Sequence, residues 1–326
     1  MKLPVFQTFS NAFGFATSNF LTCFRLAWLP FTLLFLAQQF LERAILKDMW
    51  NQTVMLGPHT APRNFFHMLL GLFQKFASIQ IGMVLLQALV IAAVAVSFHR
   101  IILFGDRREG SIVNFAFGKT EFLYTVMAVG MALITLTLLS SILVPTVYML
   151  ANGDFSGLLD KMQDVHENMP GFVHSGSFGI LMFAYAIAWL LTIYVMIRLA
   201  VWPPSVVATG HVGPSEAWNL TRGNVWRFIG LFLLTAIVIW ILMASLAITA
   251  FMGGGFEKIQ SLQSLDHKSP IELQHVLQSM YPMLPVIYIV SLVVEIFVTS
   301  LFVGLISYSY KALKGFEAAA PIPHSS

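Results

Sequence analysis

Two charged residues, Arg25 and Glu295, fall inside long apolar stretches of the sequence. Charged side chains within a membrane are costly, and they usually pair with one another, face a water-filled cavity or serve a transport path. At ~1.5 Å per helical residue, their expected depths differ by roughly 10 Å, which a long Arg side chain can bridge through neighbours or water. Two interpretations stay open. In the first, the two residues are structural: they form a buried link between helices, or Arg25 extends to the membrane interface. In the second, the Glu295 carboxylate binds a proton or a substrate during transport.

Histidine and serine motifs offer little catalytic chemistry. The sequence has no HExxH motif and no His pair at four-residue spacing, so we predict no metal site. It also lacks a GxSxG nucleophile motif and a GxxxxGK[ST] phosphate loop, and we expect a protein that is not an enzyme and needs no cofactor. The single cysteine, Cys23, lies in an apolar stretch and is expected to be a packed thiol. Six histidines fall in the polar connections between apolar stretches: His59, His67, His166, His174, His267 and His275.

The composition of the 326 residues is that of an integral membrane protein. Hydrophobic residues make up 57% of the chain and charged residues only 10%, whereas an ordinary soluble domain carries about 25% charge. The mean hydropathy of +0.78 agrees. The net charge of +3 comes without a run of Lys or Arg, so we expect no nucleic-acid partner and assign the excess to loops that face anionic lipid.

The apolar stretches predict an all-α polytopic fold with six transmembrane helices in a single transmembrane domain, residues 1–326. A helix needs roughly 20 apolar residues to cross the hydrocarbon core. Lys and Arg outnumber Asp and Glu in the connections after the second and fourth spans and at the two termini, which places both termini in the cytoplasm. The predicted spans are residues 18–40, 78–104, 122–150, 177–202, 226–251 and 283–309.

Three outer connections contain amphipathic helical patterns. Residues Phe155–Met169 and Phe65–Phe76 repeat apolar side chains at three- and four-residue spacing, and Ser269-Pro270-Ile271-Glu272 is typical of a helix start. We expect these helices to lie on the outer membrane surface or to cap the bundle. They act either as short lids that close the bundle end or as gates for a ligand.

The starts of the first, third and fifth spans resemble one another, at residues 12–21, 114–123 and 217–226. Each has an aromatic residue, an apolar residue two positions later and a polar or basic residue four positions later. The ends of spans two, four and six correspond loosely. Three tandem helical hairpins, each opened by a short cytoplasmic interfacial helix, would explain the pattern. The general preference of membrane interfaces for aromatic and cationic residues would explain it equally well.

The start of the fifth span is the strongest candidate for contact with lipid headgroups. Pro214-Ser215-Glu216 begins a helix, Gly223 can end it in the left-handed conformation, and Asn224 can cap the next helix. The side chains are either a generic interfacial anchor or a lipid-selective pocket. The candidate residues, which include two at the end of the second span, are Trp218, Arg222, Trp226, Arg227, His99 and Arg100.

Residues 216–231 resemble a motif of poorly characterised bacterial multispan proteins, A-W-x-L-T-x-G-N-x-W-R-x-x-G-L. That group includes the membrane domain attached to some glycerophosphoryl diester phosphodiesterases and related six-span inner-membrane proteins. Residues 97–106 are similar to its W-H-R-x-x-L-L-G-E element, with Phe98 and Phe104 where Trp and Leu are usual. The resemblance covers about 30 residues. It implies a bacterial inner membrane and a six-helix fold, but no activity, because the phosphodiesterase chemistry of fused members belongs to a separate soluble domain.

These observations favour a non-enzymatic inner-membrane protein that supports envelope organisation or a partner complex and contacts lipid through interfacial helices. The expected partners are membrane lipids, a second copy of the chain or another membrane protein. The alternative is a transporter or channel for a small amphiphile or lipid, with Glu295 and Arg25 along the path. A membrane-embedded enzyme that acts on lipid is the third reading, and it needs a polar constellation that the sequence does not display.

Overall fold

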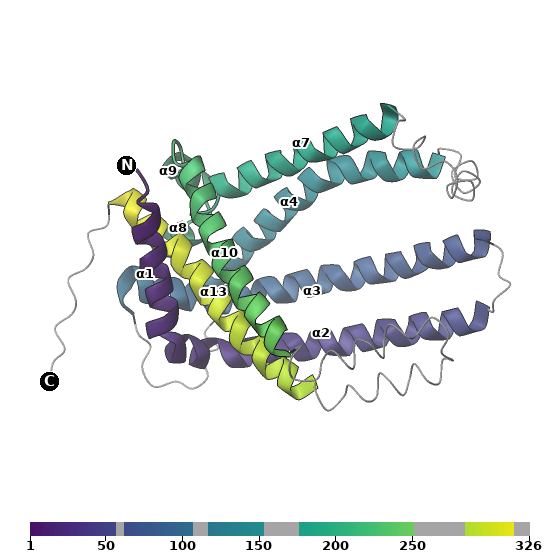
Figure 1. The fold of residues 1–326 in the computed structure, drawn as a ribbon, viewed down its shortest axis with the longest axis horizontal. Helices are drawn as coiled ribbons and strands as arrows, with labels where there is room; N and C mark the ends of the chain where they lie inside the picture. The colour runs from purple at the N-terminus through teal and green to yellow at the C-terminus, as the bar shows by residue number, and fades with distance from the viewer. Residues whose placement is uncertain (57–61, 107–116, 153–175, 251–283, 316–326) are drawn as a thin grey trace.

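The computed structural model describes residues 1–56, 62–106, 117–152, 176–250 and 284–315, and these residues are helical without strands (Figure 1). Six helices are long and apolar enough to cross a membrane, which confirms the predicted fold class and a multi-pass protein. The helices are α1 (Val5–Ser18), α2 (Phe20–Leu56), α3 (Pro62–Phe104), α4 (Lys119–Asn152), α7 (Gly176–Arg198), α8 (Trp202–Thr209), α9 (Pro214–Leu220), α10 (Val225–Ala250) and α13 (Leu284–Lys314).

Five of the observed spans agree with the predicted ones to within seven residues at each end, and the third ends at Leu138, twelve residues before its predicted end. The fourth span also differs in structure. The fourth span runs over Phe183–Thr209 and consists of two helices, because α7 ends at Arg198 and α8 begins at Trp202. Pro203 and Pro204 sit in the first turn of α8, where a missing N–H is tolerated. The six spans are Phe20–Leu41, Gly82–Phe104, Lys119–Leu138, Phe183–Thr209, Val225–Ile248 and Tyr288–Lys314.

The amphipathic segment Phe65–Phe76 is helical but is not a separate surface helix. It forms part of α3, which continues without a break into the second span. At ~1.5 Å per residue the 43 residues of α3 extend about 65 Å, roughly twice the ~30 Å hydrocarbon thickness. This segment therefore lengthens α3 instead of lying as a separate helix on the outer surface. The other two predicted amphipathic segments, Phe155–Met169 and the one beginning at Ser269, lie outside the described residues.

Helix α1 packs along α13 and belongs to the core. The two helices are antiparallel: Met1 lies beside Gly315, Ala12 beside Gly304, and the Phe13 ring contacts Phe297 with centroids 6.1 Å apart. Ala12 and Ala16 are fully buried. In Figure 1, α1 and the adjoining end of α13 lie next to each other at the end of the bundle where α8 and α9 gather.

Enlarging Gly304 should destabilise the bundle. A Cβ on Gly304 would lie 3.3 Å from Ala12 Cα and from Ala12 Cβ, so a Leu side chain forces α1 away from α13. We expect Gly304→Leu to lower the unfolding free energy by about 1–3 kcal/mol. Gly230→Leu is the matched control, because a Cβ on Gly230 of α10 has no neighbour within 4 Å. Thermal unfolding in micelles measures both variants, and equal melting temperatures would contradict the close packing.

Candidate functional site

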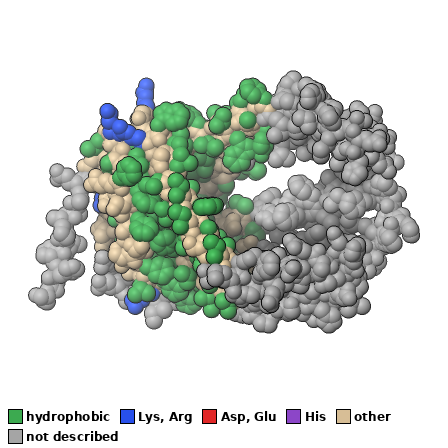
Figure 2. Space-filling view, viewed as in Figure 1, with side chains coloured by type: hydrophobic (Ala, Val, Ile, Leu, Met, Phe, Trp, Pro, Cys, Tyr) green, Lys and Arg blue, Asp and Glu red, His purple; other side chains and the backbone are tan. Residues whose placement is uncertain are grey.

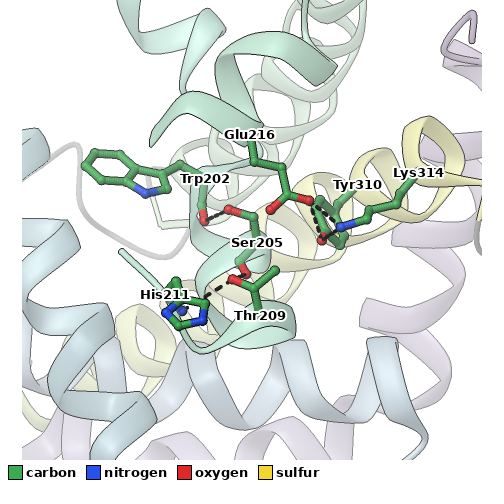
Figure 3. A network of polar contacts seen from close by, with 7 residues as sticks. All are labelled: Trp202, Ser205, Thr209, His211, Glu216, Tyr310 and Lys314. Atoms are coloured by element: carbon green, nitrogen blue, oxygen red, sulfur yellow. Dashed lines mark hydrogen bonds and ion pairs between the residues drawn. The ribbon is translucent and has the colours of Figure 1, made fainter. Parts of the chain in front are cut away.

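The cationic end of the bundle is the end where α7 finishes, α8 and α9 lie, α10 begins and α13 finishes. It carries Arg198, Arg222, Arg227 and Lys314. Figure 3 shows its internal contacts: Lys314 Nζ pairs with Glu216 of α9, and the Tyr310 hydroxyl donates to Glu216 Oε1 at 3.2 Å. Lys311 Nζ donates to Ile102 O at 3.2 Å. These contacts join the last helix, α13, to α9 and α3. In the view of Figure 2, Lys and Arg side chains lie at the margins of a mainly hydrophobic face.

The turn between α9 and α10 has the predicted glycine geometry. Gly223 has a φ of 77°, in the left-handed region that favours glycine. Thr221 is fully buried, and its Oγ1 lies 2.8 Å from Arg198 O and 2.9 Å from Ala217 O, so the turn is fastened to the end of α7. The chain therefore changes direction abruptly between the short helix α9 and the span α10.

The Asn224 side chain does not cap α10 as predicted but binds the backbone of residues 1 and 3. Its backbone oxygen accepts from Arg227 N and Phe228 N at the start of α10. Its side-chain amide instead holds the N-terminal residues: Oδ1 accepts from Leu3 N at 2.9 Å, and Nδ2 donates to Met1 O at 3.1 Å. Asn224 therefore fastens the first residues of the chain to the α9–α10 turn.

Arg198, at the end of α7, is a nearly buried cation stacked on an aromatic ring. Its side chain is only 5% exposed, and its guanidinium carbon lies 4.3 Å from the centroid of Trp218. Tyr194 contacts the same Trp218 ring edge-on, with centroids 6.3 Å apart. Arg198 Nε is buried and has no hydrogen-bond partner in the described part of the chain. A buried guanidinium without an anionic partner costs free energy, which an anion at this place would offset.

An apolar groove runs between α7 and α10 and reaches the end of α7 that carries Arg198, although Arg198 itself does not line it. Its volume is about 720 Å³, within the ~300–1,000 Å³ typical of ligand pockets. Ile197 and Ala200, on either side of Arg198 in the sequence, line one part of it, and Trp189 and Ala236 line another. The Thr192 hydroxyl in the lining donates its hydrogen to Ala188 O at 2.7 Å, so toward a ligand it can act only as an acceptor. The groove therefore offers hydrocarbon contacts almost exclusively.

Comparison with protein-family models, curated proteins and solved structures finds no match to this chain. The resemblance of residues 216–231 and 97–106 to the six-span membrane-domain group stays a prediction.

The six candidate headgroup residues occupy different environments. Arg222 and Trp226 are exposed, Trp226 to 83%, while Trp218 is half-exposed and Arg227 half-buried. Arg100 is half-buried, with Nη2 donating to Thr120 Oγ1 at 3.3 Å. His99 is fully buried, with Nδ1 2.6 Å from Ser307 Oγ, so it does not belong to the cationic end.

Arg25 and Glu295 are both exposed side chains, and the structure contains no ion pair between them within its described ranges. The interpretation that the two residues form a buried link between helices is therefore wrong. Glu295 lines a pocket between α2, α3 and α13, whereas Arg25 is not among the residues that line it.

Sequence reasoning missed Arg198, the most buried cation of the site. The residue was visible only as one more basic side chain at the end of a span. Its position beneath Trp218 depends on the Thr221–Arg198 hydrogen bond across 23 residues, and no local pattern reports such a contact.

Proposed function

We propose that the chain is a non-enzymatic multi-pass membrane protein that holds a phospholipid at its cationic end. The observation that carries the proposal is the apolar groove of about 720 Å³ at the end of α7, close in the chain to Arg198, whose buried Nε has no hydrogen-bond partner among the described residues. An acyl chain would occupy the groove between α7 and α10. The phosphate would lie at its mouth, near Arg198 and the exposed Arg222, because guanidinium groups form strong charge-assisted hydrogen bonds to phosphate.

The aromatic residues of α9 and α10 support this placement. Trp218 stacks on Arg198, and Trp226 is 83% exposed at the second residue of α10. Trp is enriched at the headgroup level of membranes, where its ring is half in an apolar environment. The excess of Lys and Arg at this end matches the cytoplasmic side under the positive-inside rule. We therefore propose that both termini lie in the cytoplasm, and the resemblance of residues 216–231 would make the membrane a bacterial inner membrane.

The role that follows is support for envelope organisation or a partner complex. Exposed hydrophobic side chains on α7 and α10, such as Ile187, Leu190, Ile237 and Trp240, would face either lipid or another membrane protein. A bound phospholipid at the end of α7 would fix the separation of α7 and α10, and with it the shape of this outer face.

Transport of a small amphiphile is the second candidate function, and one observation favours it: Glu295 lines a pocket. Arg25, the other residue expected along such a path, does not line that pocket. We therefore rank lipid binding first.

Neutralising Arg198 should release the bound phospholipid. We expect the purified wild-type chain to retain about one phospholipid after delipidation in a neutral detergent, and Arg198→Gln to retain several-fold less, because the phosphate loses its charge-assisted partner. Native mass spectrometry measures the bound lipid directly. Lys119→Gln, which removes an exposed cation at the start of α4, is the matched control and should retain lipid. Equal retention by Arg198→Gln, or no lipid on the wild-type chain, would overturn the proposal.

A further inference from the structure

A smaller pocket, separate from the groove between α7 and α10, lies between α2, α3 and α13. Its volume is about 250 Å³. Polar side chains reach it from all three helices: Gln38 from α2, Gln87 from α3, and Ser291 and Glu295 from α13. Aromatic and aliphatic side chains, among them Phe35, Tyr288 and Leu292, form the rest of the wall. Most of the other exposed side chains on these three spans are apolar, so a pocket with four polar side chains is unusual there.

The polar side chains of this pocket lie at a common depth, far from the cationic end. At ~1.5 Å per residue, Gln38 is about 27 Å along α2 from its start at Phe20. Gln87 is about 26 Å along α3 from its end at Phe104, and Glu295 is about 24 Å along α13 from Lys311. Three helices therefore bring one carboxylate and two amides to the same level within spans of the hydrocarbon core.

Glu295 has no compensating partner at that depth. The side chain makes no hydrogen bond and no ion pair in the ranges that the structure describes, and it is exposed to the pocket. Ionisable residues within spans usually face a cavity and act on a substrate or ion, because a carboxylate surrounded by hydrocarbon is costly. A cation that enters the pocket would offset this cost.

The walls of the pocket favour an organic cation over a metal ion. The rings of Phe35 and Tyr288 lie with their centroids 4.2 Å apart at an angle of 31°, which forms an aromatic wall next to the carboxylate. The Tyr288 hydroxyl donates to Thr32 Oγ1 at 2.6 Å, which holds its ring in place. Aromatic faces attract ammonium groups. Ca²⁺ and Mg²⁺ instead require about six or more oxygen ligands in a compact shell, and Glu295 is the one carboxylate among the lining residues.

We propose that this pocket binds the alkylammonium group of a cationic amphiphile. Glu295 supplies the opposite charge, and the Phe35–Tyr288 wall supplies aromatic contact. The volume of about 250 Å³ suits the headgroup alone, so the alkyl tail extends past Leu34 and Leu292 toward the lipid between α2 and α13. The pocket shares no lining residue with the phospholipid groove, although α13 contributes to both, with Ile306 in the groove and Glu295 in the pocket. The two proposals can therefore fail independently.

Calorimetric titration with octyltrimethylammonium tests the site. The full chain is kept in dodecyl maltoside micelles, which carry no charge, and the heat measured with empty micelles is subtracted. We expect saturable binding to the wild-type chain and about tenfold or weaker binding to Glu295→Gln, equivalent to about 1.4 kcal/mol. Asp106→Asn removes an exposed carboxylate outside the pocket and should bind as the wild type does. Titration with 1-octanol should give the same small heat for all variants.

A second variant fills the pocket and keeps the charge. Ser291→Phe places a ring at an exposed position of the lining, so it should abolish binding while Glu295 remains. Equal affinity of the wild type and Glu295→Gln would overturn the proposal. Unchanged binding by Ser291→Phe would also overturn it, because the cation would then be held at a surface charge outside this pocket. An equal loss in Asp106→Asn would show nonspecific attraction and contradict a built site.

Discussion

His99→Ala should lower the unfolding free energy of the bundle by about 3 kcal/mol, the typical cost of removing a large buried side chain. His99 lies on α3 and is fully buried. Its ring lies between α13 and α4, with Nδ1 2.6 Å from Ser307 Oγ and Nε2 3.4 Å from the Tyr124 hydroxyl. The alanine variant leaves a cavity where three spans meet and removes both hydrogen bonds at once.

The hydrogen-bond pattern determines which ring nitrogen carries the proton. Ser307 Oγ donates to Val303 O at 2.6 Å, and a hydroxyl has a single hydrogen to donate. Ser307 Oγ must therefore accept from His99 Nδ1–H, which leaves Nε2 to accept from the Tyr124 hydroxyl. Replacement by alanine leaves that buried hydroxyl without this acceptor, which adds a desolvation cost of about 1–3 kcal/mol where no other partner is found.

Reversible unfolding in mixed micelles of sodium dodecyl sulfate and dodecyl maltoside measures the effect. Arg100→Ala, at the adjacent position, is the control: it removes a half-buried side chain whose hydrogen bond to Thr120 is 3.3 Å long. We expect Arg100→Ala to cost about 1 kcal/mol or less. If the two variants unfold alike, His99 does not join the three spans as the structure indicates.

Ala236→Phe should prevent a phospholipid acyl chain from occupying the groove between α7 and α10. Ala236 is exposed and lines the groove, so a phenyl ring at this position occupies groove volume without entering the packed core. We expect the amount of phospholipid retained after delipidation to fall several-fold while the thermal stability of the chain changes little. The charge at Arg198 stays in place, so this variant tests the acyl-chain part of the proposal alone.

Ala247→Phe is the matched control for the groove. Ala247 lies on the same helix, α10, is also exposed and does not line the groove. Native mass spectrometry should find wild-type lipid occupancy in Ala247→Phe and reduced occupancy in Ala236→Phe. Reduced occupancy in both variants would point to a general effect of aromatic bulk on α10, and unchanged occupancy in both would remove the groove from the proposal.

Local patterns predicted much of the fold. Hydrophobic length alone located the six spans, because a bilayer imposes the same requirement on every crossing helix. Pro214 at the start of α9 and Gly223 in the left-handed conformation were also predicted, since both depend on the backbone preferences of single residues. The break between α7 and α8 was not predicted, although Pro203 and Pro204 mark the new helix start.

The contacts that build the candidate site are long-range, and the sequence could not reveal them. The Asn224 amide bonds to residues 1 and 3, more than 200 positions away, instead of capping its own helix. The sequence could not show whether Arg25 and Glu295 form a pair, because depth along two helices does not specify which helix faces meet. The Phe35–Tyr288 contact, in the wall of the pocket that Glu295 also lines, joins α2 to α13. Such juxtapositions depend on helix rotation, which hydropathy does not encode.

The packing of α1 against α13 has a consequence for the order in which the protein folds during its synthesis. Ala12 and Gly304 touch in the finished bundle but are separated by most of the chain. At ~5–20 residues per second, a ribosome needs roughly 15–60 s to reach Gly304 after it has made Ala12. During that interval the Ala12 face of α1 stays without the helix that will cover it, while the first five spans are synthesised. Helix α1 is therefore made long before α13 and reaches its final packing only after α13 has been made.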